Sequence, residues 1–129
     1  MKKEKFVIRV ESSFEAAHNL REYYGKPEPL HGHSWKVEVK IESSNLDDEA
    51  ISVDYVKVKK ALDVLTKKLD YTYINEVSPF NKINPSSENI AKWFYGNLNR
   101  KELLGKGKLA EIIIWEGPLN HVAYSCTTT

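Results

Sequence analysis

The sequence predicts an α+β fold, in which two helices cover one face of a four-stranded antiparallel sheet. Two patterns lead to this prediction. Apolar and polar residues alternate near both ends of the chain, as they do in strands with one buried face. In the middle of the chain, apolar residues recur at intervals of three and four, as they do in amphipathic helices. The expected order of elements is therefore ββααββ, with both helices packed on the same face of the sheet.

The first two strands are expected at KFVIRVESSF and SWKVEVKIES. In the first segment the apolar residues Phe6, Ile8 and Val10 share one face. In the second segment lysines and glutamates occupy one face, and the other face carries Trp35, Val37, Val39 and Ile41. The connecting segment REYYGKPEPL contains a glycine and two prolines, which indicates a loop. The two strands can therefore pair as a hairpin.

Two amphipathic helices are expected in the middle of the chain. The first follows Asp54, and its apolar stripe consists of Tyr55, Val58, Leu62, Leu65 and Leu69. The second begins after Ser86, a residue type that favours the N-cap, and Glu88 in its first turn complements the helix dipole. Its buried stripe consists of Ile90, Ala91, Phe94 and Leu98.

Two further strands are expected at LAEIIIWE and VAYSC, on either side of a turn at Gly117 and Pro118. Residues 1–129 then form a single domain, which is large enough to bury a core without disulfide bonds. Because both helices cover one face, the other face and the sheet edges are left open. We therefore expect the chain to associate with further copies of itself.

The composition excludes several classes of partner. The chain has 19 Lys and Arg against 18 Asp and Glu, so its formal net charge of +1 provides no general attraction to nucleic acids or membranes. No segment is apolar over the length of a membrane span, and the start MKKEKFVIRV lacks the apolar region of a signal peptide. The single cysteine excludes an intrachain disulfide. We therefore expect a cytoplasmic protein.

The segment EPLHGHSW places two histidines at the start of the second strand. His31 and His33 are two positions apart and point to the same face of a strand. Gly32 between them leaves room for a group close to the backbone. His18, at the end of the first strand, lies across the expected hairpin. Three protein ligands with one open position are typical of catalytic zinc, so these histidines predict a Zn²⁺ site.

Six segments, FEAAH, LHGHSWKVEV, ISVDYVKVK, LDYTYIN, NPSSENIAKW and IIIWEGP…AYS, have the order and spacing of one protein family. Through them the chain resembles the 6-pyruvoyl-tetrahydropterin synthase and 6-carboxy-tetrahydropterin synthase family over nearly its whole length. The resemblance implies a tunnelling fold, in which subunits join their sheets into a barrel, commonly as a homo-hexamer of two trimers. It also implies active sites between subunits and zinc bound by the three histidines.

The resemblance further implies that Glu116 anchors the pterin ring of a small-molecule substrate. The chemistry of the side chain agrees with this role. A carboxylate accepts two parallel hydrogen bonds, and the 2-amino and ring N–H groups of a pterin present two donors side by side.

The chain departs from this family at two positions of the proton-transfer machinery. Members that make the pyruvoyl or carboxy product have a cysteine four residues before the HGH motif, where this chain has Pro27. They also have a histidine after the helix-terminal Leu-Asp pair, where this chain keeps Asp70 but has Tyr71. Cys126 is almost at the end of the given sequence, and we do not expect it to replace the missing thiol. Glu28 remains in the loop, three residues before the HGH motif.

A subset of the family has a glutamate in this loop instead of the cysteine. These members cleave the side chain of 7,8-dihydroneopterin triphosphate to 6-hydroxymethyl-7,8-dihydropterin, a folate precursor. The resemblance therefore implies a zinc-dependent pterin lyase in which Glu28 and Asp70 are catalytic. In that chemistry zinc polarises the side-chain oxygens as a Lewis acid, and the carboxylate beside it moves a proton.

Two alternatives to the lyase stay open. One is synthesis of 6-carboxy-5,6,7,8-tetrahydropterin, for deazapurine (queuosine) biosynthesis, or of 6-pyruvoyl-tetrahydropterin. The other is a non-catalytic oligomer that binds a pterin or a purine. The sequence also leaves open whether Tyr71 or His121 takes the place of the missing histidine.

Overall fold

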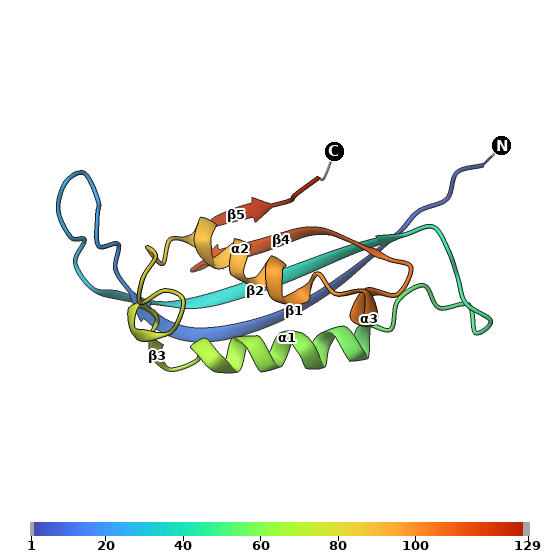
Figure 1. Cartoon of the computed structure of the whole chain (residues 1–129), viewed down its shortest axis with the longest axis horizontal. Coiled ribbons are helices and arrows are strands. Elements are labelled where there is room, and N and C mark those ends of the chain that lie inside the picture. The colour runs from blue at the N-terminus through green and yellow to red at the C-terminus, as the bar shows by residue number, and fades with distance from the viewer. Residues whose placement is uncertain (1, 128–129) are drawn as a thin grey trace.

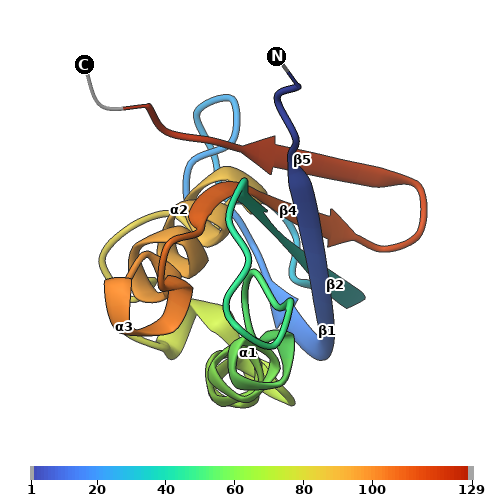
Figure 2. The ribbon, with the colours of Figure 1, turned by 90° about the vertical axis from the view of Figure 1, so that its right-hand side faces the viewer.

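A computed structural model describes residues 2–127 (Figure 1). The elements in chain order are β1 (Phe6–His18), β2 (His31–Ser43), α1 (Tyr55–Leu69), β3 (Thr72–Tyr73), the 3₁₀ turn η1 (Ile74–Glu76), α2 (Ser87–Leu98), α3 (Lys101–Leu104), β4 (Lys108–Glu116) and β5 (Asn120–Tyr124). Both long helices lie on the same side of the sheet, as Figure 2 shows in a view turned by 90°. The predicted α+β class is confirmed.

The sheet has five strands in the order β3-β1-β2-β4-β5, rather than the four expected from the sequence. The additional strand, β3, pairs in parallel with Ala16 and Ala17 of β1. It forms because the chain turns sharply after α1, where Tyr71 has a φ of 56° and its N–H donates to the carbonyl of Glu15. A strand of two residues is too short to produce an alternating pattern, so the sequence does not reveal it.

The core lies between the helices and the inner face of the sheet. Asp54 caps α1 by accepting from the N–H of Val56, and Ser86 caps α2 by accepting from the N–H of Asn89. The second helix buries the predicted stripe. In the first helix, however, Tyr55 is 63% exposed, because it occupies the first position of α1, away from the sheet. The short helix α3, which the sequence pattern did not predict, closes the far end of the core with Leu103 and Leu104.

A β-bulge in β4 adapts its apolar residues to the core. Lys40 pairs with Glu111 and Ile41 pairs with Leu109, so Ala110 is the extra residue. Without the extra residue, strand alternation would turn Leu109 to the outer face, which the helices do not cover. With it, Leu109 and Ile112 both face the core and are at most 2% exposed.

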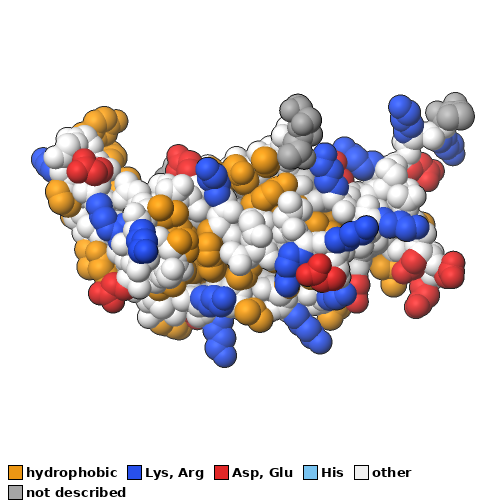
Figure 3. Space-filling model, viewed as in Figure 1, with side chains coloured by type: hydrophobic (Ala, Val, Ile, Leu, Met, Phe, Trp, Pro, Cys, Tyr) orange, Lys and Arg blue, Asp and Glu red, His pale blue; other side chains and the backbone are white. Residues whose placement is uncertain are grey.

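The outer face of the sheet is polar and internally paired. Glu38 is 7% exposed, although it lies on this uncovered face. Its carboxylate accepts from Arg9 Nε at 3.0 Å and from the Trp115 indole N–H at 2.7 Å. Figure 3 shows the opposite side of the molecule, where α2 lies in front of the sheet; cationic side chains are scattered over this surface, with fewer anionic ones and patches of apolar ones. No helix in residues 2–127 is long and apolar enough to cross a membrane.

Leu62 tests this account of the core, because it is fully buried in α1, whereas Val64 on the same helix is 59% exposed. We expect Leu62→Ala to lower the free energy of unfolding by about 2–5 kcal/mol. Val64→Ala, the matched control, should change it by no more than about 0.5 kcal/mol. Urea denaturation followed by tryptophan fluorescence measures both values. Similar losses for the two variants would contradict the proposed packing.

Candidate metal centre

The β1–β2 hairpin brings the three predicted histidines together. His18 pairs directly with His31, and Ala16 pairs with His33. Residues that oppose one another across a strand pair share a face, so all three imidazoles project to the side of the helices. Their ring centroids are 4.6–6.0 Å apart. Gly32 is not sterically required here, since an added Cβ would meet only the carbonyl of Ala16 at 3.8 Å.

Backbone carbonyls orient two of the three rings. Nδ1 of His18 lies 2.7 Å from the carbonyl oxygen of Pro85, and Nδ1 of His31 lies 2.9 Å from that of Pro29. A carbonyl only accepts hydrogen bonds, so Nδ1 carries the proton in both rings. When the ring is neutral, Nε2 then presents a lone pair to the cluster. Such second contacts are how proteins fix the tautomer of metal-binding histidines.

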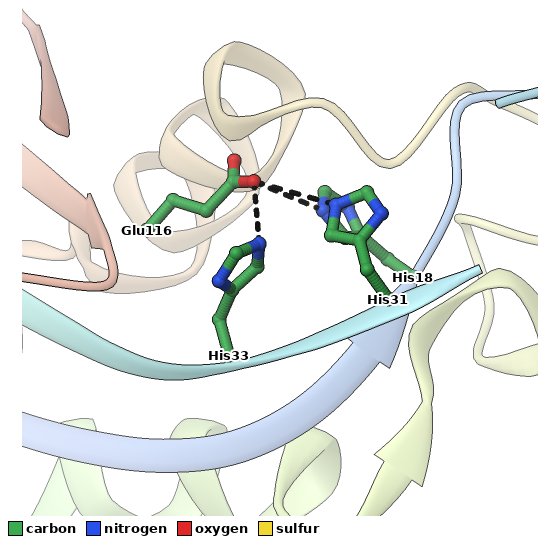
Figure 4. Close-up of side chains that lie close together, drawn as sticks. All are labelled: His18, His31, His33 and Glu116. Atoms are coloured by element: carbon green, nitrogen blue, oxygen red, sulfur yellow. Dashed lines mark hydrogen bonds and ion pairs between the residues drawn. The ribbon is translucent and has the colours of Figure 1, made fainter. Parts of the chain in front are cut away.

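Glu116, the last residue of β4, points its carboxylate at the same spot (Figure 4). Its Oε1 lies 2.9 Å from Nε2 of His33, 3.4 Å from Nε2 of His18 and 3.5 Å from Nε2 of His31. Its Oε2 accepts a hydrogen bond of 2.9 Å from the hydroxyl of Ser87, in the first turn of α2. The carboxylate is therefore held between the histidines and the start of α2.

The donor set fits a divalent metal ion. One candidate ligand atom from each of His18, His31, His33 and Glu116 lies within 4.8 Å of all the others. The Nε2 atom of His33 is buried and has no hydrogen-bond partner in the described part of the chain, although Oε1 of Glu116 is close to it. Imidazole nitrogens and a carboxylate oxygen are ligands that suit zinc and similar ions. An ion among them would satisfy the buried nitrogen.

The charges within the cluster shift two pKa values. The hydrogen bond with His18 lowers the pKa of Glu116 to about 2, and Ser87 adds to this effect, against the opposing influence of burial. Burial by itself would lower the pKa of His18. The hydrogen bonds to Glu116 and Pro85 outweigh it, so the pKa of His18 lies above 6.5. Glu116 is therefore ionised at neutral pH, and the cluster attracts cations.

A pocket of about 250 Å³ adjoins the cluster at the start of α2. It is lined by Ser87, Glu88, Glu116, Asn120, His121 and Val122. Glu116 therefore contributes both to the histidine cluster and to this pocket. The pocket is concave and polar, and it contains a fixed carboxylate that can orient a ligand with N–H donors.

Glu28 lies beside the cluster, on the Nδ1 side of His31. Its Oε1 is 3.8 Å from Nδ1 of His31 and accepts a hydrogen bond of 3.0 Å from the N–H of Leu20. The side chain is 22% exposed. The loop is closed at its base, because the N–H of Glu28 donates to the carbonyl of Leu20. Glu28 is thus held near the histidines and remains accessible from outside.

Asp70 lies elsewhere in the single chain. Its Oδ1 accepts from the N–H of Glu15 at 2.8 Å, which joins the end of α1 to β1. Tyr71 is 85% exposed and lines a second pocket with Ser34 on the outer face. In residues 2–127, no hydrogen bond or ion pair connects Asp70 to Glu28 or to the histidines.

His121 and Cys126 also lie outside the cluster. His121 is on β5 and packs against Trp115, with ring centroids 4.3 Å apart. Cys126 is exposed beyond β5, and its carbonyl accepts a hydrogen bond from the hydroxyl of Tyr95. The loop that carries Glu28 contains no thiol.

Residues 7–126 match the family model of 6-pyruvoyl tetrahydropterin synthase. The chain belongs to this family. It is 36% identical to the dihydroneopterin monophosphate aldolase of Pyrococcus furiosus, over 82% of this chain and 85% of that protein. It is also 35% identical to the 6-carboxy-5,6,7,8-tetrahydropterin synthase of Synechocystis, over 78% of this chain and 80% of that protein.

Solved structures of this family have the same fold. The 6-pyruvoyl tetrahydropterin synthase of Caenorhabditis elegans aligns with a TM-score of 0.78 at 23% identity, over 98% of this chain and 99% of that chain. The 6-pyruvoyl tetrahydropterin synthase of Plasmodium vivax aligns with a TM-score of 0.79 at 19% identity, over 97% of this chain and 99% of that chain. The tunnelling fold expected from the sequence is consistent with these matches.

The sequence does not reveal two contributors to the site. The hydroxyl of Ser87 holds Glu116, and the carbonyl of Pro85 orients His18. Ser87 follows the predicted N-cap Ser86, so its location on α2 was predicted. Its partner was not, because no pattern in the sequence relates the start of α2 to the end of β4.

His33 tests the metal centre, because its buried Nε2 faces the cluster. We expect purified protein to contain a stoichiometric divalent metal ion and His33→Ala to lose most of it, since one ligand is removed. His121→Ala, the matched control, should keep the wild-type metal content. Atomic emission spectrometry measures both. Full metal content in His33→Ala would show that the ion binds elsewhere.

Proposed function

We propose that the chain is a zinc-dependent pterin lyase. It cleaves the side chain of 7,8-dihydroneopterin triphosphate, or of a related dihydroneopterin, to 6-hydroxymethyl-7,8-dihydropterin. The observation that carries this proposal is the carboxylate of Glu28 beside the histidine cluster, in a loop without a thiol. The identity to a dihydroneopterin monophosphate aldolase supports the same class of reaction.

The reaction requires a base near the substrate side chain. Glu28 removes the proton from the hydroxyl on the outer carbon of the carbon–carbon bond that breaks. The carbon–carbon bond then cleaves as the carbonyl forms, and its electron pair passes to the carbon attached to the pterin. Protonation of that carbon gives the hydroxymethyl group, and the other fragment leaves as an aldehyde. The hydrogen bond from Leu20 fixes Oε1 of Glu28 and so orients the carboxylate for proton transfer.

His18, His31 and His33 would hold the zinc ion, which would supply Lewis-acid polarisation of the side-chain oxygens. The pocket beside Glu116 would hold the pterin. The carboxylate of Glu116, which Ser87 positions, would accept hydrogen bonds from the 2-amino and ring N–H groups of the pterin. The substrate side chain would then extend from the pocket towards the histidines and Glu28.

We also propose that Asp70 is catalytic, and that it acts in an active site formed by two or more copies of the chain. In one chain Asp70 is bound to the backbone of β1 and does not contact Glu28. We therefore assign Asp70 to a site shared with a second copy, as in the homo-hexamer of two trimers that the family resemblance implies.

The second candidate is 6-carboxy-5,6,7,8-tetrahydropterin synthesis, which the relative from Synechocystis favours. The loop before the HGH motif argues against this activity, because it contains Glu28 but no cysteine. Cys126 is exposed beyond β5, outside this loop, which weighs against it as a substitute thiol. The third reading, a non-catalytic pterin- or purine-binding oligomer, predicts binding without turnover.

Substitution of Glu28 distinguishes the three hypotheses. General acid–base catalysis contributes about 10²–10⁴-fold to a rate. We therefore expect Glu28→Gln to slow formation of 6-hydroxymethyl-7,8-dihydropterin by that factor, with metal content unchanged. Glu22→Gln, an exposed carboxylate of the same loop, is the control and should react at the wild-type rate.

Incubation with dihydroneopterin triphosphate and mass spectrometry of the products measures these rates. A wild-type rate in Glu28→Gln would remove its assigned role. Formation of 6-carboxy-tetrahydropterin would support the second candidate. The absence of any product would support the non-catalytic reading.

Glu116 tests how the pterin is bound. In Glu116→Ala the two N–H donors lose their charged acceptor, which should weaken binding by about 2–5 kcal/mol. Titration calorimetry with dihydroneopterin measures the change, and Glu111→Ala on the outer face provides the control. Equal affinities in wild type and Glu116→Ala would place the pterin elsewhere.

A further inference from the structure

We propose that Glu116 is an exchangeable fourth ligand, which binds the metal ion through Oε1 in the absence of substrate and leaves it to bind the heterocycle. The identity of the heterocycle rests on the proposed function. The ligand role of Glu116 rests on the geometry of the cluster alone.

The position of Oε1 supports its role as a ligand. It faces the Nε2 atoms of all three histidines at 2.9–3.5 Å, where an ion held by these nitrogens would meet it. Glu28 cannot take this place, because its carboxylate approaches His31 from the Nδ1 side. Glu116 therefore completes a set of three nitrogens and one oxygen, which is the usual number of ligands for zinc.

The same carboxylate has a second role that excludes the first. To accept two parallel N–H donors, both carboxylate oxygens must face the heterocycle. In the structure Oε2 is on the side of Ser87, which lines the adjoining pocket, whereas Oε1 is directed into the histidine cluster. Binding of both donors therefore requires Oε1 to turn away from the histidines.

This exchange couples the two parts of the site. While the pocket is empty, Glu116 would complete the ligand set of an ion held by the three histidines. When the heterocycle enters, its two donors would draw the carboxylate away from the histidines. An ion held there would then be open to substrate only after the ring is in place.

Cobalt(II) provides a direct test, because its visible absorption depends on the number and type of its ligands. Apo protein is loaded with Co²⁺ as wild type, Glu116→Gln, Glu116→Asp and the control Glu111→Gln. Circular dichroism establishes that each variant is folded. We expect wild type and Glu111→Gln to share one spectrum, and both Glu116 variants to differ from it.

Zinc affinity, measured by competition with a chelator, should fall at least about tenfold in Glu116→Gln, the loss typical of groups that tune a metal site. Identical spectra and affinities in wild type, Glu116→Gln and Glu116→Asp would overturn the proposal. This comparison uses no pterin and is independent of the proposed reaction.

The exchange is tested by adding 7,8-dihydropterin, which has the ring but no side-chain oxygens. We expect the wild-type cobalt spectrum to shift towards that of Glu116→Gln. If calorimetry shows that the ring binds while the spectrum stays constant, the exchange is overturned and the proposed function stands. If the ring does not bind at all, the proposed function and the exchange are both overturned.

Discussion

The pairing of β1 with β2 is the constraint on which the rest of the structure depends. Their antiparallel register runs without a break from Phe6 opposite Ser43 to His18 opposite His31. Because side chains alternate with a period of two, a slip of β2 by one residue would turn His31 and His33 to the outer face and separate them from His18 on β1. The register is fixed by packing on the inner face. Phe14 stacks on Trp35 with ring centroids 5.7 Å apart, and the indole N–H of Trp35 donates to the carbonyl of Ala16. The histidine cluster is therefore a continuation of the core, and the same contacts order both.

Polar groups on the buried face need fixed partners, and the loops at this end of the sheet supply them. The segment after η1 carries Pro85, whose carbonyl orients His18. Arg21 holds this segment in place, because its guanidinium donates to the carbonyls of Asn75, Phe80 and Ile83 at 2.6–3.0 Å. A loop without regular structure thus gains a defined geometry from one cation. The role of Arg21 is structural, yet through this loop it determines the direction in which the imidazole of His18 points.

The sequence predicted the parts of the molecule that depend on local periodicity. The two helices, the long hairpin and the convergence of His18, His31 and His33 all follow from spacing within segments. The parts that depend on distant segments were missed. Strand β3 exists only because α1 ends beside β1, and the contact between Ser87 and Glu116 joins the start of α2 to the end of β4. The same limit explains why Glu116 was assigned to the pterin alone, since strand alternation does not reveal what lies opposite a side chain in space.

The charge of Glu116 explains why these residues form a site and not merely a polar end of the core. The lowered pKa of its carboxyl group keeps it ionised at neutral pH, and three imidazole nitrogens face the same oxygen. A neutral imidazole that presents its lone pair to a carboxylate is repelled, so the cluster is favourable only with positive charge at its centre. A proton on His18 supplies this charge to one ring and leaves Nε2 of His33 without a partner. A divalent ion can accept lone pairs from all three rings and from the carboxylate together. The charges and lone pairs of this arrangement therefore suit a metal ion better than a proton, and the same carboxylate lines the adjoining pocket.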